Sequence, residues 1–378
     1  MELGWIDFSK TERKKVLQVL DLLGEDGILD ELGIAPIRDY FSNLFFPGIS
    51  TVQTRAKYFL IIPYIFKDLE CSNQSDSRTP KQRLNDAERE CAIKLLDNNP
   101  EATGIIGKIA INNGKWVNRT PAKIYWSGLW KYRLIQNEHL AENVHMSIDD
   151  SICNKDINLN IETYTEDWDK NLDIKLTSEE GEFLKNKIMT TCGDNMIGII
   201  LSDEKNFFNV FDCKDFYELR HVIKNFPEHI KNDYYKALYF SEFVFALRVV
   251  YNVVISGGQN EEANDWLDKL NFREISKIDV EDLFVSSGIN NPKLKKFLTK
   301  SKCLMENNEI EELKECVKLH EISLKKNKAK SLHPGEFDCE MWYGGRVLDY
   351  RFQNAKRILK DICESKNQST EVNKDVKS

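Results

Sequence analysis

Histidine is scarce in this chain, with six residues among 378, at positions 139, 145, 221, 229, 320 and 333. No two of them form an H-x-x-x-H, H-E-x-x-H or H-x-E arrangement, which would place two metal ligands on one helical face. The sequence also has no G-x-S-x-G elbow and no P-loop, so neither an activated serine nor a Walker-type phosphate site is indicated. We therefore predict no metal, no cofactor and no familiar catalytic centre.

Paired cysteines and an export signal are missing as well. The nine cysteines are odd in number, and none shows C-x-x-C or another zinc-ligand spacing, which is typical of free thiols in a reducing compartment. The start MELGWIDFSKTERKK lacks the basic and apolar regions of a signal peptide. The most apolar stretch, Tyr234–Ile255, carries Lys236, Glu242 and Arg248, and such charges are costly in lipid. We expect a cytoplasmic protein whose apolar stretch is a core helix, without a membrane partner.

The composition that remains is that of a globular protein, with 41% hydrophobic and 30% charged residues. Helical periodicity dominates and strand patterns are rare, so we predict a mainly α, multi-helical fold with two lobes. Residues 142–182 hold twelve acidic residues against three lysines, which suggests a linker. The expected domains are an N-terminal helical domain at 1–140, an acidic linker at 141–177, a C-terminal helical domain at 178–364 and a disordered tail at 365–378.

Caps and breakers give the helix boundaries. A capping box at Ser9–Glu12 and an apolar stripe predict a helix over 10–23, and Ala35-Pro36 starts a helix that runs to Phe46. A third helix is expected from Ser50 or Thr51 to about residue 70, kinked or broken at Pro63. Further helices are predicted over 86–98, 121–132, 178–190, 195–202, 214–225, 233–256, 262–270, 279–286, 292–300, 308–319 and 346–364.

One segment stands apart from the acidic chain. Gly104–Asn137 contains six basic residues and no Asp or Glu, whereas the whole chain has a net charge of −8. An apolar stretch, a turn at Asn112–Gly114 and a second helix capped by Thr120-Pro121 predict a helix-turn-helix-like segment, with or without a wing. Trp116, Tyr125, Trp126, Trp130 and Tyr132 lie between the basic residues.

Cations can hold phosphates while aromatic faces stack on bases, so this mixture indicates a nucleic-acid surface. The competing interpretation is that the aromatic residues form core and the lysines a solvated face. Residues 50–58, where the third helix is expected to start, are rich in hydrogen-bonding side chains and could receive a phosphate at the helix end. Ordinary capping explains that pattern too. The candidate nucleic-acid-binding residues are Lys108, Lys115, Arg119, Lys123, Trp126, Lys131, Arg133, Gln53 and Arg55.

Three other patterns have simple structural explanations. A basic run at Lys325–Lys330 leads to a turn before the last helix. Ser241, Arg248 and Asn252 form a polar stripe on the apolar helix 233–256, for which we predict a satisfied hydrogen-bond network. The triplets Asp173-Ile174-Lys175 and Asp203-Glu204-Lys205 contain the acid and lysine of restriction-type nucleases. They also arise by chance in a chain so rich in charge, so a nuclease remains only an alternative.

Several strings resemble an uncharacterised bacterial family, a domain of unknown function. They are Gly4-Trp5-Ile6-Asp7-Phe8-Ser9, the stretch from Arg38 to Ala56, Ile124-Tyr125-Trp126-Ser127-Gly128-Leu129, and Leu348-Asp349-Tyr350-Arg351. The similarity spans most of the chain and is weaker from about 140 to 330. It implies a component encoded near helicases and restriction-type genes of bacterial defence islands, and it brings no catalytic residues with it.

These observations lead to three functional hypotheses. The first is a non-catalytic, DNA-associated accessory component of an anti-phage or restriction-type system, with a helicase or nuclease subunit as its partner. The second is a protein-interaction scaffold without nucleic-acid contact. The third is a nuclease of unfamiliar type, which would require metal-dependent degradation that disappears when Asp173 or Asp203 is replaced.

Overall fold

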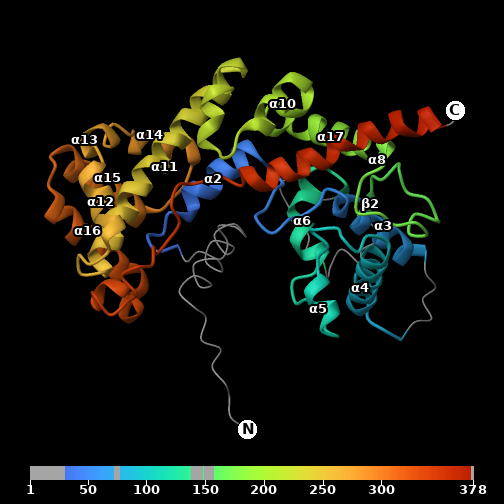
Figure 1. The fold of residues 1–378 in the computed structure, drawn as a ribbon, viewed down its shortest axis with the longest axis horizontal. Coiled ribbons are helices and arrows are strands. Elements are labelled where there is room, and N and C mark those ends of the chain that lie inside the picture. Colours follow the sequence, from blue (N-terminus) through green and yellow to red (C-terminus); the bar gives the residue numbers. More distant parts are fainter. Residues whose placement is uncertain (1–29, 72–76, 138–147, 149–156, 376–378) are drawn as a thin grey trace, which may run out of the picture. The chain divides into compact units, whose positions relative to one another are not determined.

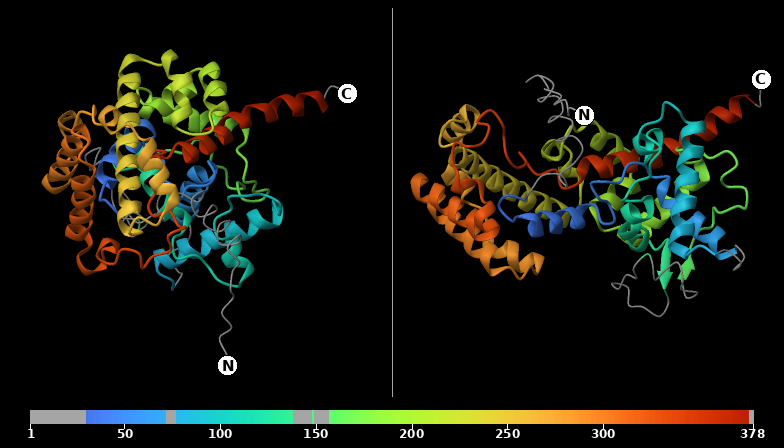
Figure 2. Two further views of the ribbon diagram at one scale, coloured as in Figure 1. Left: turned by 60° about the vertical axis from the view of Figure 1, so that its left-hand side comes forward. Right: turned by 90° about the horizontal axis from the view of Figure 1, so that it is seen from below.

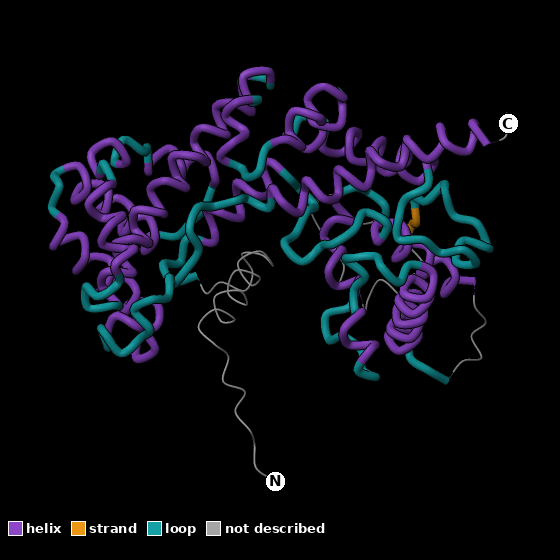
Figure 3. The backbone as a smooth tube through the Cα atoms, viewed as in Figure 1, coloured by secondary structure: helices purple, strands orange, loops and turns teal. Residues whose placement is uncertain are grey.

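The structure is a computed structural model that describes residues 30–71, 77–137, 148 and 157–375. Within that part of the chain it is mainly α-helical and contains a single two-stranded sheet (Figures 1 and 3). The mainly α prediction is therefore confirmed. The helix predicted over 10–23 lies outside the described residues.

Two compact units make up the chain, and each consists of segments that are distant in sequence. Unit 1 contains the described residues up to Ser42 together with Ile223–Tyr350, and unit 2 contains Asn43–Val222 and the chain from Arg351 onward. The expected domain boundaries do not coincide with these units. The chain changes unit at Ser42, at Val222 and at Tyr350, and the last helix, α17 (Phe352–Asp375), lies along α8 (Ser178–Cys192) in unit 2 (Figures 1 and 2).

Unit 1 is built around one long apolar helix, α11 (Glu228–Ile255). By length and composition α11 is able to cross a membrane, but 78% of its most apolar window is buried inside the protein, as the sequence predicts for a core helix. The surrounding helices are α2 (Ala35–Phe45, whose end belongs to unit 2), α12 (Glu261–Lys269), α13 (Phe272–Ile275), α14 (Val280–Ser287), α15 (Pro292–Glu306) and α16 (Ile310–Lys325), with short 3-10 turns at Ile223–Asn225, Lys326–Lys328 and Lys330–Leu332.

The polar stripe on α11 fastens the segment that precedes α17. Ser241 Oγ accepts a hydrogen bond from the Leu348 N–H at 2.8 Å. Asn252 donates to the Tyr343 carbonyl at 2.9 Å and accepts from the Tyr343 N–H at 2.7 Å, and Arg248 donates to a carbonyl of the same segment at 2.9 Å. The predicted satisfied network is confirmed.

That attachment also explains why the last helix starts later than predicted. The sequence predicts helix from residue 346, but α17 begins at Phe352 because the preceding backbone bonds to α11 instead. Tyr350 and Arg351 then take left-handed φ values of +50° and +64°, a conformation that interrupts a right-handed helix. At its other end α17 reaches Asp375, through residues for which the sequence predicts a disordered tail.

In unit 1, lysines of the basic run pair with buried carboxylates. Lys325 and Lys330 form ion pairs with Glu31, which is 5% exposed. Glu321 is fully buried and accepts hydrogen bonds from the Tyr251 hydroxyl at 2.7 Å and from two backbone N–H groups at 3.2 and 3.0 Å. Lys325 is also 3.2 Å from Glu321. These two lysines therefore stabilise the interior of unit 1.

Unit 2 contains the segment with the anomalous charge. Its elements are α3 (Tyr58–Cys71), α4 (Pro80–Asn98), α5 (Lys108–Asn112), α6 (Pro121–Lys131), β1 (Ile135–Asn137), β2 (Ile157–Leu159), α8, α9 (Met196–Ser202), α10 (Glu204–Asp212), a 3-10 turn at Tyr217–His221, and α17. Strands β1 and β2 pair antiparallel, with Ile135 opposite Leu159. Helices α8 and α17 approach closely at Gly181, where an added Cβ would lie 1.8 Å from Ser365 Oγ. Packing on α8 thus carries α17 past residue 364, where the sequence predicts its end.

The third helix starts later than predicted, and it is not broken at its proline. Helix α3 begins at Tyr58, not at Ser50 or Thr51. Backbone N–H groups of Thr54 and Arg55 donate to the Tyr125 hydroxyl at 2.8 and 3.0 Å, and the N–H of Ala56 donates to Asp361 at 2.8 Å. Because side chains take these donors, residues 50–57 form turns. Pro63 lies inside α3, which continues to Cys71.

The described end of the acidic segment is packed inside unit 2. Leu172, Ile174 and Leu176 are each at most 2% exposed, and the Tyr64 hydroxyl lies 2.7 Å from Thr163 Oγ1. The alternation of apolar and polar residues over 172–176 explains this burial. In its described part, residues 157–177, the expected linker is therefore a packed segment.

Candidate functional site

Helix α6 is the centre of the basic segment, and its sequence explains how it is held. Thr120 and Pro121 begin the helix, as the capping pattern predicts. One face is buried, with Ala122, Tyr125 and Leu129 fully inaccessible. The Tyr125 hydroxyl bonds the 54–56 backbone, so the buried face fixes α6 relative to the start of α3.

The opposite face of α6 carries positive charge. Lys123, Ser127 and Lys131 are exposed and follow one another at four-residue spacing, which aligns them along one side of a helix. The Lys123 ammonium donates to the Asn118 carbonyl at 3.2 Å. Lys115 and Arg119 are exposed in the loop between α5 and α6. None of these four cations forms an ion pair with an Asp or Glu in the described part of the chain.

Two other predicted basic residues have different surroundings. Lys108 donates to the carbonyls of Pro100 and Ala102, at 2.8 and 3.3 Å, so it stabilises the loop before α5. Arg133 is exposed just after α6 and has a left-handed φ of +53°. Four predicted cations thus belong to the basic face, which we define as Lys115, Arg119, Lys123 and Lys131.

The aromatic residues of the segment mostly serve as core. Tyr125 and Tyr132 are fully buried, and Trp116 donates to Asn85 at 3.0 Å. The ring of Trp126, a predicted site residue, stacks on Phe66 with centroids 6.0 Å apart and meets Trp130 edge-on at the same separation. Base stacking by these rings therefore has less support from the structure than phosphate contact by the lysines.

The remaining predicted site residues, Gln53 and Arg55, lie in the turns before α3. Gln53 is buried, donates to the Gly48 carbonyl at 3.0 Å and accepts from the Ser50 N–H at 3.1 Å. Arg55 forms an ion pair with Asp361 at 2.9 Å. Both side chains stabilise the turns, so the structure does not bring them together with the basic face.

The buried side chain of Glu88 bonds to the first turn of α6, the helix that carries part of the basic face. No sequence pattern predicts this contact. Glu88 on α4 is 2% exposed and accepts a 2.6 Å hydrogen bond from the Ala122 N–H in the first turn of α6. Burial raises the pKa of Glu88 from 4.5 to about 7, although the Ala122 hydrogen bond and the Lys123 charge lower it. Glu88 occupies the amino end of α6, so an external phosphate has to be held by side chains.

We expect this acid to make stability depend on pH. The folded protein holds the Glu88 proton more tightly than the unfolded chain does, so its contribution is complete below about pH 4.5 and is lost as the pH rises to about 7. Relative to Glu88→Gln, the wild type should lose roughly 1–3 kcal/mol of unfolding free energy across that window. Urea denaturation of both proteins, at low concentration because the pI is about 5.5, measures this difference. The exposed neighbour variant Glu90→Gln is the control, and parallel pH profiles for wild type and Glu88→Gln would contradict the assignment.

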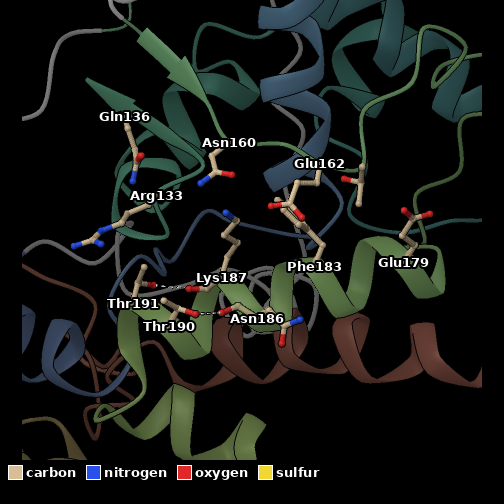
Figure 4. A pocket seen from close by; sticks show the side chains of 11 residues that line it. Arg133, Gln136, Asn160, Glu162, Glu179, Phe183, Asn186, Lys187, Thr190 and Thr191 are labelled. Carbon is tan, nitrogen blue, oxygen red and sulfur yellow. Dashed lines mark hydrogen bonds between the residues drawn. The ribbon is translucent and has the colours of Figure 1, made fainter. Parts of the chain in front are cut away.

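Next to α6 lies a polar pocket of about 390 Å³. Arg133 and Gln136 stand on one side, Asn160 and Glu162 follow β2, and Lys187 projects from α8 (Figure 4). The Lys187 ammonium lies 5.2 Å from the centre of the Phe183 ring, a cation–π contact. Burial lowers the pKa of Lys187. Of these residues the sequence predicts only Arg133 as a site residue, because the others are separated along the chain and match no motif.

Comparison with known proteins places the sequence in one family. Residues 1–366 match a family of unknown function. The chain belongs to DUF6361. The match covers all the strings that carry the resemblance to an uncharacterised family, so that part of the resemblance is confirmed. No curated protein and no solved structure matches the chain.

In this member of DUF6361, the two nuclease-like triplets have local structural roles. Asp173 accepts a hydrogen bond from the Lys175 N–H at 2.9 Å, and Asp203 caps α10 by accepting from the Lys205 N–H at 2.9 Å. Over the described residues, no group of three or more His, Cys, Asp and Glu side chains is placed to hold a metal ion. The hydrogen bonds of both aspartates thus satisfy nearby backbone groups.

Proposed function

We propose that this protein is a non-catalytic accessory component that binds DNA through the basic face of α6 and the loop before it. The observation that carries the proposal is the exposure of Lys115, Arg119, Lys123 and Lys131 without ion pairs to described acids, on a chain with a net charge of −8. A local cluster of this kind attracts phosphate where the overall field repels it.

The order of elements supports a helix-turn-helix-like arrangement with a wing. Helix α5, a turn and α6 follow one another, and α6 leads directly to β1, which pairs antiparallel with β2. In helix-turn-helix proteins the second helix enters the major groove. Helix α6 takes that position in the chain and exposes a charged side.

The spacing of the lysines fits the dimensions of DNA. Lys123 and Lys131 are eight residues apart on one helix, which corresponds to about 12 Å along its axis. The major groove is about 12 Å wide. A helix lying across the groove would therefore bring the two ammonium groups to the phosphates on its two sides.

A catalytic partner completes the proposal. The basic face offers charge for binding, and the nuclease-like aspartates bond to nearby backbone N–H groups, so chemistry on the DNA would come from another protein such as a helicase or nuclease subunit. The anti-phage or restriction-type setting enters through the family resemblance alone.

Charge reversal on α6 tests the proposal. Lys123→Glu combined with Lys131→Glu should weaken binding to a short DNA duplex roughly tenfold or more and should flatten the salt dependence by about two phosphate contacts. Fluorescence anisotropy of the full chain at about 50 and 200 mM salt measures both quantities.

The matched control is Lys175→Glu combined with Lys205→Glu. These two lysines of unit 2 are exposed and make the same change in net charge. If both double variants reduce binding equally, the effect belongs to net charge and the basic face is not the site. The same holds if the α6 variant binds as the wild type does.

A protein-interaction scaffold is the second candidate, and one observation favours it. Phe208 on α10 is 66% exposed and lines an apolar groove of about 400 Å³. Exposed aromatic patches often mark protein contacts. A chain that shows no salt-sensitive DNA binding but copurifies stably with a neighbouring gene product would support the scaffold.

A further inference from the structure

The polar pocket beside α6 has the volume and the donors of a small-ligand site. Its volume of about 390 Å³ lies in the range of pockets that hold small molecules, roughly 300–1,000 Å³. Its walls come from the stretch after α6 that includes β1, the residues after β2, and α8 (Figure 4). Three segments of the chain therefore converge on one cavity.

Lys187 is the group in this pocket best prepared for an anion. In the part of the chain that the structure describes, its ammonium forms no ion pair within 4 Å and is positioned over the Phe183 ring at 5.2 Å, while the nearby Glu162 carboxylate partly offsets the lowering of its pKa by burial. Figure 4 shows its side chain rising from α8 toward Asn160. Because the side chain is already held in place, an anion bound there would not have to order it.

Arg133 adds a second cation and an unusual backbone. Its φ of +53° lies in the left-handed region, which glycine or asparagine occupies at lower cost. Unfavourable backbone conformations of this kind concentrate at functional sites. Arg133 lies on the wall of the pocket, and its guanidinium points away from Lys187 (Figure 4), so it adds positive charge at the edge of the pocket.

The other polar groups of the pocket suit a sugar and a base. Gln136, Asn160 and Asn186 present amides, which can both donate and accept, as the edge of a nucleobase requires. Glu162 provides a carboxylate across the pocket from Arg133 (Figure 4), and carboxylates accept hydrogen bonds from ribose hydroxyls.

We infer that this pocket binds a nucleoside phosphate, with the phosphate at Lys187 and the sugar and base toward Glu162 and the amides. The ligand is either a free nucleotide or the phosphorylated end of a strand, since both present the same chemistry. The inference does not depend on the proposed function of α6.

Calorimetric titration of the full chain with the four ribonucleoside 5′-monophosphates tests this inference. At least one should bind, and removing its phosphate should weaken binding tenfold or more, because the charged hydrogen bonds would be lost. Lys187→Met, which keeps an apolar stem over Phe183, should weaken binding by a similar factor. Lys185→Met on the same helix lies outside the pocket and should bind as the wild type does.

Several outcomes would overturn the inference. These are no binding of any monophosphate at millimolar concentration, equal binding by Lys187→Met and wild type, and inorganic phosphate binding as tightly as the nucleotides. A 5′-phosphorylated oligonucleotide that competes when its 5′-hydroxyl form does not would identify the strand end as ligand; the absence of competition would identify the free nucleotide. The α6 double variant should keep nucleotide binding, so the two proposals can fail separately.

Discussion

Replacing Lys57 with methionine is expected to lower the free energy of unfolding by about 3–5 kcal/mol, because it leaves a buried carboxylate without its counter-charge. Lys57 and Glu180 are 5% and 7% exposed, and the ammonium lies 2.6 Å from both carboxylate oxygens. Glu180 also accepts a hydrogen bond from the Thr177 N–H at 2.8 Å. Chemical denaturation at neutral pH measures the loss.

The double variant Lys57→Met with Glu180→Gln tests whether the lost stability comes from the unpaired Glu180 carboxylate. Glutamine keeps an acceptor for the Thr177 N–H, and methionine fills the space of the lysine stem, so most of the lost stability should return. A double variant as unstable as the sum of the two single variants would mean that the two charges do not interact. Lys67→Met, in the exposed ion pair with Glu70, should change stability by less than about 1 kcal/mol.

The second large effect is expected in unit 1, where Glu321→Ala should cost about 3–5 kcal/mol. The substitution removes the acceptor of the Tyr251 hydroxyl and of two backbone N–H groups. It also leaves Lys325 and Lys330 with Glu31 as their shared carboxylate. Thermal and chemical denaturation, with circular dichroism as the signal, would show the loss.

Glu315→Ala on the same helix is the matched control for Glu321→Ala. Its side chain is 57% exposed and lies 3.9 Å from Lys318, so its loss should change stability by less than about 0.5 kcal/mol. Equal effects of the two substitutions would show that the ion cluster around Glu321 does not stabilise unit 1.

Local signals in the sequence predict much of the fold. Thr177, for example, caps α8 through a box with Glu180, and Pro292 starts α15; both depend on neighbouring residues alone. The start of α3 could not be predicted in this way, because Tyr125 and Asp361 take the backbone donors of residues 54–56. Long-range partners of this kind leave no periodic trace near residue 54.

The candidate site shows the same distinction between local signals, which can be predicted, and long-range contacts, which cannot. The absence of acids between Gly104 and Asn137 is visible in the sequence, and five of the six cations that it singled out are exposed. The roles of Gln53 and Arg55 could not be predicted, because they follow from contacts with Gly48 and Asp361. The pocket around Lys187 depends on the convergence of three segments, for which no local motif exists.

The bond between Ala56 and Asp361 has a consequence for synthesis of the chain. The backbone before α3 is bound to α6 through Tyr125 and to α17 through Asp361, so the unit that carries the basic face includes a helix that follows the whole Ile223–Tyr350 segment. On the ribosome, amino-terminal segments emerge and start to fold first. Unit 2 therefore cannot complete its packing until α17 has been translated, long after the Asn43–Val222 segment.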